Sequence, residues 1–137
     1  MKSFLLEIVT PQRVAYSDSC DMVVVPSASG AMGILSRHTP LFAELTEGEL
    51  KIEAKGETYY LAIGGGFVEV RKDKVTVLVT RAVHARELNE AEIARARKQA
   101  EESLTVASSD QDRAVSHTLL RQSIVDMQVL RRMRRRH

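Results

Sequence analysis

The predicted fold depends most on one stretch, GILSRHTPL at residues 33–41. A glycine-bounded apolar pair leads into a polar turn, and Pro40-Leu41 closes it. This order is typical of a strand that ends in a tight exposed corner and restarts as a second strand. His38 therefore lies at a loop tip, where binding residues tend to sit. On local features alone, His38 is either an exposed turn histidine without a role or a contact residue at a protein interface.

Alternating apolar residues flank this corner on both sides. The patterns at residues 4–9, 50–54 and 75–79 are those of half-exposed strands. Residues 22–25 form a continuous apolar run, which is typical of a strand buried on both faces. Gly64–Gly66 precedes a β pattern rather than a helix, so it indicates a bulge or a close backbone approach instead of a phosphate loop. Short strands joined by turns predict an antiparallel sandwich or flattened barrel.

The composition changes at Arg86. All seven Gly, all three Pro and all six aromatic residues precede it, and the rest is rich in Ala, Glu, Arg, Gln and Leu, which favours helix. Asn89 is a good N-cap, and Glu92 three residues later completes a capping-box pattern. Residues 107–110 then end this helix and cap a second one. We therefore predict a β domain over residues 1–86 and an antiparallel two-helix hairpin over residues 87–137.

The predicted hairpin has few apolar side chains to bury. Its first helix has the stripe Ile93, Ala96, Ala100 and Leu104, and its second has the apolar side Leu120, Ile124, Met127 and Leu130. A buried Leu, Ile or Met contributes roughly 1.5–3 kcal/mol. Ordering both helices costs far more than the first stripe returns. We therefore expect the hairpin to depend on docking and to be a candidate mobile regulatory arm.

Several function classes are disfavoured by composition. No nucleophile-base-acid order, phosphate loop or metal-ligand spacing stands out, so we predict a non-enzyme without metal or cofactor. Cys20 is the single cysteine and borders an apolar run, so we expect it to be buried. No apolar run reaches the roughly 18 residues of a membrane span, and Glu7 interrupts any signal-peptide core. We expect a reducing, cytoplasm-like compartment, with any membrane attachment made through partners.

Charge is distributed unevenly although the net charge is only +2. The last 25 residues hold seven Arg and one acid, Asp126. This basic end fits a solubilising helix terminus, a clamp on an acidic protein surface or a nucleic-acid contact. The helical half has no aromatic residue for base stacking, which argues against nucleic acid. Acidic side chains of the β half are interpreted as a solvated face: Glu44, Glu47, Glu49, Glu53 and Glu57.

The chain resembles the epsilon subunit family of the F-type ATP synthase, bacterial form, which corresponds to the mitochondrial delta subunit. The resemblance is carried by residues 6–11 (LEIVTP), 30–41 (GAMGILSRHTPL), 65–70 (GGFVEV) and 75–78 (VTVL). It extends through the helix that begins near Leu88 and covers essentially the whole chain. It implies a β sandwich of about ten short antiparallel strands followed by a two-helix hairpin.

The resemblance implies a non-catalytic subunit of the central stalk. Its sandwich would bind the gamma subunit and rest on the rotor ring of c subunits, coupling proton-driven rotation to ATP synthesis in the alpha/beta catalytic head. Location would be peripheral, on the cytoplasmic side of the cell membrane, without insertion. Arg37 and His38 would contact the ring. In some bacterial members the hairpin extends along gamma and blocks ATP hydrolysis; basic side chains would then meet an acidic segment of the beta subunit, here Arg113, Arg121, Arg131 and Arg132.

The chain departs from the family pattern in two regions. Many members carry Glu where this chain has Ala31, so the ring contact would rest on Arg37, His38 and their neighbours. ATP-binding members carry Asp and Arg where this chain has Asn89 and Glu92. A carboxylate at residue 92 would repel phosphates, so we predict weak or absent ATP binding. Two other functions are also considered: a free-standing β-sandwich adaptor that regulates a helical protein and, less favoured, a nucleic-acid-binding module that uses the Arg-rich end.

Overall fold

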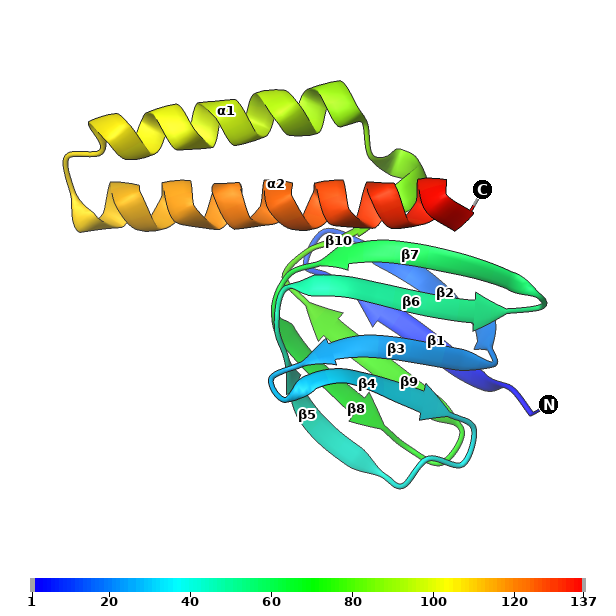
Figure 1. The fold of residues 1–137 in the computed structure, drawn as a ribbon. Helices are drawn as coiled ribbons and strands as arrows, with labels where there is room; N and C mark the ends of the chain where they lie inside the picture. The colour runs from blue at the N-terminus through cyan, green and yellow to red at the C-terminus, as the bar shows by residue number, and fades with distance from the viewer. Residues whose placement is uncertain (1, 137) are drawn as a thin grey trace.

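The computed structural model describes residues 2–136. Within that range a β domain precedes a helical hairpin, as predicted (Figure 1). The strands are β1 (Phe4–Val9), β2 (Val14–Cys20), β3 (Met22–Ser27), β4 (Gly30–Leu35), β5 (Leu41–Leu45), β6 (Gly48–Ala54), β7 (Glu57–Ile63), β8 (Gly66–Val70), β9 (Lys74–Val79) and β10 (Ala82–His84). A 3-10 turn, Ala85–Glu87, leads to α1 (Glu90–Val106) and α2 (Asp110–Arg136).

The strands form one sheet that folds over to enclose the core. Their order is β10-β7-β6-β3-β5-β8-β9-β1-β2, and β4 pairs with β3. The expected antiparallel pairing is wrong at one place, because β1 and β9 run parallel. These two strands are far apart in sequence, so no tight turn sets their relative direction.

Strand periodicity places the core as the sequence predicted. Leu6, Ile8 and Val77 are fully buried, and Leu50 and Ile52 alternate with half-buried side chains. The prediction that residues 22–25 are buried on both faces is wrong. Only the face of β3 that carries Val23 and Val25 is enclosed by the sandwich, while Met22 and Val24 are half-buried.

Two glycine-containing turns explain how the strands approach one another. Lys55 and Gly56 have φ angles of 53° and 78°, and this pair makes the tight β6–β7 turn. At Gly66 the close approach predicted from the glycine run is confirmed. A Cβ there would collide with the carbonyl oxygen of Leu78 on β9. Only glycine lets β8 and β9 pair at this distance.

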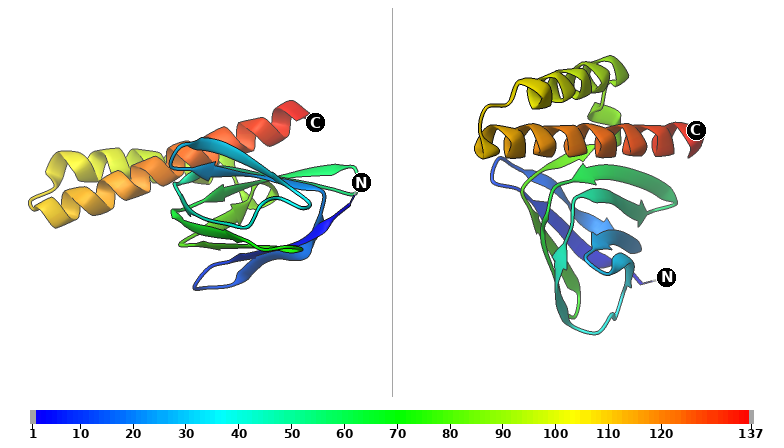
Figure 2. Two further views of the ribbon diagram at one scale, coloured as in Figure 1. Left: turned by 90° about the horizontal axis from the view of Figure 1, so that it is seen from below. Right: turned by 60° about the vertical axis from the view of Figure 1, so that its left-hand side comes forward.

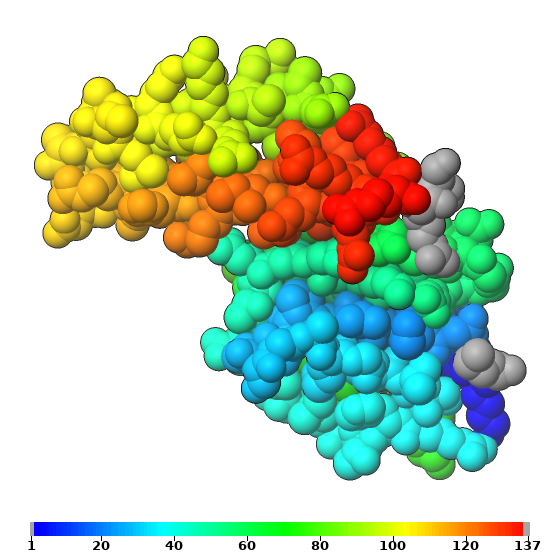
Figure 3. Space-filling model, viewed as in Figure 1, coloured from blue at the N-terminus to red at the C-terminus, as the bar shows by residue number. Residues whose placement is uncertain are grey.

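The hairpin caps one side of the sandwich through α2. Figures 1 and 2 show α2 lying along β6, β7 and the 3-10 turn, with α1 stacked on its outer side. The space-filling view in Figure 3 shows the α1–α2 connection extending past the sandwich edge. The first cap is confirmed, since the side-chain oxygen of Asn89 accepts a 3.1 Å hydrogen bond from the Glu92 amide. Ser109 accepts a 3.0 Å bond from the Asp112 amide and caps α2.

The predicted apolar stripes of the hairpin are only partly buried. Ile93 and Ala100 are buried on α1, whereas Ala96 is exposed. On α2 Leu130 is buried, while the other predicted apolar positions, Leu120, Ile124 and Met127, are half-buried. The rest of the buried α2 set is largely polar: Ser116, Ser123, Asp126 and Val129. Helix α2 therefore uses a more polar seam than its sequence pattern predicted.

Candidate functional site

The corner at residues 33–41 lies at the end of the sandwich farthest from the helices (Figure 1). Strand β4 ends at Leu35, and Arg37 takes a left-handed φ of 65°. The His38 amide donates a 3.2 Å hydrogen bond to the Leu35 carbonyl, and its ring Nδ1 lies 2.7 Å from the Thr39 carbonyl oxygen. Arg37 is exposed and His38 half-buried, so the corner presents a fixed basic edge to solvent.

Ala31 does not belong to this edge. It is the second residue of β4 and pairs with Pro26 of β3, whereas His38 lies beyond the other end of the strand. A strand advances about 3.3 Å per residue, so Ala31 to Leu35 alone spans about 13 Å. Positions 31 and 38, expected to share one contact, therefore lie at opposite ends of β4.

An apolar stripe crosses the outer face of β5, β8 and β9. Phe42 and Phe67 are 64% and 44% exposed, and their rings stack with centroids 5.3 Å apart. Leu78, 50% exposed, is the cross-strand neighbour of Phe67. Solvent-facing aromatic rings at adjacent strands mark interaction surfaces. Sequence reasoning missed this stripe, although Phe42 shares the outward phase of Glu44 and Phe67 that of Glu69.

The four arginines singled out on α2 fall into two groups. Arg121 donates from Nε to Glu47 at 2.6 Å, and Arg132 donates from Nε to Glu49 at 3.1 Å. Glu47 immediately precedes β6, and Glu49 is its second residue. Arg113 pairs instead with Asp110 within α2, and Arg131 is exposed. The interpretation of Glu47 and Glu49 as a purely solvated face is wrong, because docking of α2 brings these acids beneath its arginines.

A further ion pair joins the sandwich to the middle of α2. Arg81 precedes β10, and its two terminal nitrogens donate to the two carboxylate oxygens of Asp126 at 2.8 and 2.7 Å. The Asp126 side chain is only 9% exposed. Sequence reasoning recorded Asp126 as the lone acid of the Arg-rich end and missed its partner. Nothing local identifies a partner 45 residues away.

The helical hairpin and Arg81 surround a surface hollow of about 320 Å³. Its polar lining includes Gln99, Gln122 and Ser123. The Arg81 guanidinium in this wall is already paired with Asp126, and Asn89 and Glu92 form a helix cap. Weak or absent ATP binding stays a prediction.

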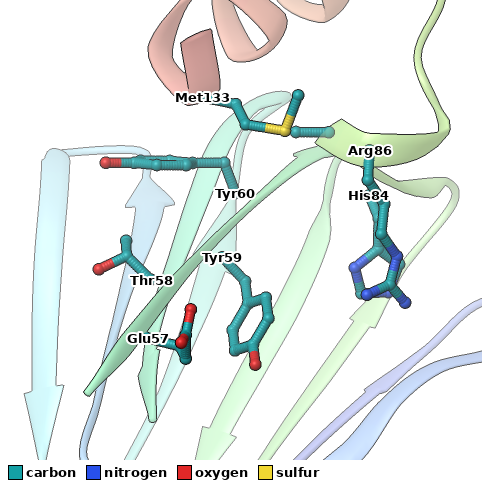
Figure 4. A pocket seen from close by; sticks show the side chains of 8 residues that line it. Glu57, Thr58, Tyr59, Tyr60, His84, Arg86 and Met133 are labelled. Carbon is teal, nitrogen blue, oxygen red and sulfur yellow. The ribbon is translucent and has the colours of Figure 1, made fainter. Parts of the chain in front are cut away.

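A smaller hollow of about 170 Å³ lies where the C-terminal part of α2 meets the sandwich. Figure 4 shows Tyr60 and Met133 on one side of it and His84 with Arg86 on the other. The His84 ring is nearly buried, and its Nε2 lies 2.7 Å from the Ala15 carbonyl oxygen. Because this imidazole is committed to the backbone, we interpret the hollow as a packing seam.

Nucleophilic and metal chemistry find little support in the described residues. Burial, with a contribution from Asp21, raises the pKa of the Cys20 thiol to about 12, so it stays protonated at neutral pH. Its predicted burial is confirmed at 1% exposure. Among residues 2–136, no group of three or more His, Cys, Asp or Glu side chains is placed to hold a metal ion.

Comparisons with known proteins agree on one family. Residues 3–85 match the family described as ATP synthase, Delta/Epsilon chain, beta-sandwich domain. The ATP synthase epsilon chain of Herpetosiphon aurantiacus is 42% identical over 131 residues, covering 96% of each chain. That of Alkalilimnicola ehrlichii is 34% identical over 137 residues, covering 99% of this chain and 98% of the relative.

Solved structures share the fold at low sequence identity. A chain in the mitochondrial ATP synthase of Euglena gracilis, solved with its F1 and c-ring, aligns with a TM-score of 0.67 at 18% identity. The alignment covers 96% of this chain and 79% of that one. A chain from the central stalk and c-ring of the Tetrahymena thermophila enzyme gives 0.53 at 17% identity, covering 79% and 98%.

Proposed function

The chain belongs to the ATP synthase delta/epsilon family, and from this membership we propose that it is a non-catalytic rotor subunit of the central stalk of an F-type ATP synthase. It would couple proton-driven rotation to ATP synthesis in the alpha/beta head. The relatives are similar over nearly their full length, so the proposal concerns the sandwich and the hairpin together. The adaptor and nucleic-acid alternatives are set aside because family membership accounts for the whole chain.

The observation that carries a stalk role is the exposed stripe Phe42–Phe67–Leu78. Its residues extend across three adjacent strands on a rigid sheet, with Glu44 and Glu69 beside the two rings. Apolar side chains exposed to this degree gain free energy when a partner covers them. We propose that the gamma subunit covers this stripe.

The stripe is tested by replacing both phenylalanines with serine. Because both rings face solvent, the double variant should fold normally but bind gamma at least about tenfold more weakly in reconstitution. The matched control is Val14→Ser, which removes an apolar side chain that is 57% exposed on β2. Unchanged gamma binding by the Phe42→Ser/Phe67→Ser variant would contradict the assignment.

We propose that Arg37 and His38 contact the rotor ring. Their corner is the part of the sandwich remote from the hairpin, and its backbone is held by the Leu35 carbonyl. His38→Ala in the assembled enzyme should reduce proton pumping per ATP hydrolysed. His117→Ala, an exposed histidine on α2, is the control and should leave coupling unchanged. Normal coupling in His38→Ala would show that the corner acts through its shape rather than through the imidazole of His38.

The hairpin is proposed to restrain ATP hydrolysis. In the docked position Arg121 and Arg132 are occupied by Glu47 and Glu49, so α2 must leave the sandwich before these arginines meet the beta subunit. Arg113 and Arg131 would complete that contact. Deleting the residues after Arg86 should raise ATP hydrolysis by the assembled enzyme and leave assembly intact. Hydrolysis that stays unchanged would rule out an inhibitory arm.

Two further proposals concern membrane and nucleotide. No helix within residues 2–136 is long and apolar enough to cross a membrane. We propose that the chain is held peripherally at the cytoplasmic side of the cell membrane by its partner subunits.

We also propose that the chain does not bind ATP, because the Arg81 guanidinium is already paired with Asp126 and Glu92 is acidic. A micromolar dissociation constant for ATP in calorimetry of this chain would contradict that proposal.

A further inference from the structure

Three ion pairs with alternating signs join α2 to the sandwich. From the helix come Arg121, Asp126 and Arg132, and from the sandwich come Glu47, Arg81 and Glu49. We name this set the charge clamp. Along the helix the charges are positive, negative and positive, and each is paired with an opposite charge on the sandwich. Along α2 the charged positions span about 16 Å, so the clamp covers roughly three turns of the helix.

The central pair differs from the outer two. Arg81 and Asp126 form a two-point contact, with side-chain exposures of 28% and 9%. The outer arginines, Arg121 and Arg132, are 54% and 52% exposed. Solvent-exposed pairs contribute little to stability, whereas removing one partner of a buried pair leaves an uncompensated charge. The Arg81–Asp126 pair therefore dominates the clamp.

The rest of the seam specifies position poorly. Its apolar part contains Val129, Tyr60, Ala62 and Ala85, with Val125 and Met133 at the margin. The buried cluster is small, and among its buried members only Val129 comes from α2, so the apolar contacts alone restrain sliding along the helix weakly. A slide of one helical turn, 5.4 Å, would separate Asp126 from Arg81 and leave a carboxylate in a nearly buried site. The charges, rather than the apolar contacts, distinguish one docked position from its neighbours.

We propose that the charge clamp, through Arg81–Asp126, selects the single docked register of the hairpin and decides whether the hairpin is docked or released. A buried pair suits this purpose because much of its attraction is offset by desolvation. When α2 leaves, both ions regain water, so the pair discriminates between registers without binding the helix irreversibly. This inference concerns the chain alone and holds whatever partner the released hairpin meets.

The experiment measures hairpin position in the full-length chain. Spin labels on cysteines at Lys72, in the β8–β9 turn, and at Glu102, on α1, report the separation of sandwich and hairpin in a Cys20→Ala background. The chain with the native clamp should give one narrow distance distribution in pulsed electron spin resonance. Asp126→Asn keeps the shape of the side chain but leaves Arg81 without its counter-ion. It should raise the ratio of released or shifted to docked molecules at least about tenfold.

Two further variants separate charge from folding. Exchange of the pair, Arg81→Asp with Asp126→Arg, should restore the narrow distribution in part. Glu101→Gln removes the exposed Arg97–Glu101 pair within α1 and should change nothing. Cooperative thermal unfolding of the sandwich checks that each variant is folded. An unchanged distribution in Asp126→Asn would overturn the proposal, and so would release in the exchanged variant equal to that of Asp126→Asn.

Discussion

The sandwich and the hairpin are held in place by different forces. Inside the sandwich, Leu6, Ile8 and Val77 are fully buried among other apolar side chains. On α2 the buried positions are mixed: Val129 and Leu130 are apolar, and Ser116, Ser123 and Asp126 are polar. A domain stabilised by its own apolar core stays folded whether or not other segments are docked on it. A small seam that mixes polar and apolar contacts gives a defined position at a lower cost of separation. The difference indicates a rigid platform that carries a separable arm.

A matched pair of truncations gives the largest expected effect. Leu61 and Leu130 are 0% and 2% exposed, one in the sandwich and one on α2. Leu61→Ala should reduce the free energy of unfolding of the sandwich by about 2–5 kcal/mol. Leu130→Ala should leave the sandwich transition in place and destabilise the helices only. Urea unfolding followed by tyrosine fluorescence and by helical circular dichroism separates the two. Equal loss of sandwich stability in both variants would mean that the regions unfold as one unit.

The glycine at the β8–β9 contact sharpens the description of the platform. Gly66→Ala should cost about 1–3 kcal/mol, because its new methyl group meets the Leu78 carbonyl oxygen and the strands must shift. The control is Gly33→Ala, where the added carbon meets nothing within 4 Å. Thermal unfolding of both variants provides the measurement. If Gly66→Ala were as stable as Gly33→Ala, close approach would not be what requires glycine here.

The outer pairs of the charge clamp should have a smaller effect. Glu49→Gln removes the partner of Arg132, whose side chain is 52% exposed, so docking should weaken by less than about 1 kcal/mol. The loss should shrink further at high salt, because exposed charges are screened. The loss of docking is measured by the hydrogen-exchange protection of the hairpin amides at low and at high ionic strength. A loss as large as that in Asp126→Asn would show that the outer and central pairs are equivalent.

The smallest expected effect lies at the linker between the two regions. A hydrogen bond from Arg13 lowers the pKa of Glu87, with a further contribution from the His84 amide. A lowered folded-state pKa adds stability that is present above the unfolded value, about 4.3, and is lost as pH falls through the folded value. Both side chains are about 40% exposed, so the contribution is a few tenths of a kcal/mol. The protection factor of the Leu88 amide, its exchange rate compared with that of an unstructured amide at the same pH, should fall at acid pH, and less so in Glu87→Gln. Identical pH profiles would contradict this account.

Sequence periodicity predicted the platform better than the arm. The apolar phases of β1, β6 and β9, the turn at Lys55-Gly56 and the cap at Asn89 all follow from neighbours in sequence. The parallel β1–β9 pairing and the Arg81–Asp126 pair did not, because each joins distant segments. Which charges meet depends on how α2 lies on the sandwich, and local pattern does not contain that placement.

The stripe Phe42–Phe67–Leu78 could have been found from sequence. Both aromatic residues stand at outward phases of strands whose other outward residues are Glu44 and Glu69. An aromatic ring at a polar phase predicts a contact surface. The corner at His38 was identified correctly as an exposed turn, whereas its separation from Ala31 required the strand geometry. Contact of Arg37 and His38 with the rotor ring stays a prediction.

The most direct test of a separable arm is hydrogen–deuterium exchange of the full-length chain, resolved to peptides. If a large apolar core holds the platform and only a small seam, positioned by charges, holds the arm, amides in β1, β6 and β9 should exchange only through global unfolding. Amides of α1 and α2 should exchange faster, by a separate opening, and faster still in Asp126→Asn. Exchange of helices and strands at one common free energy, unchanged by Asp126→Asn, would contradict the account.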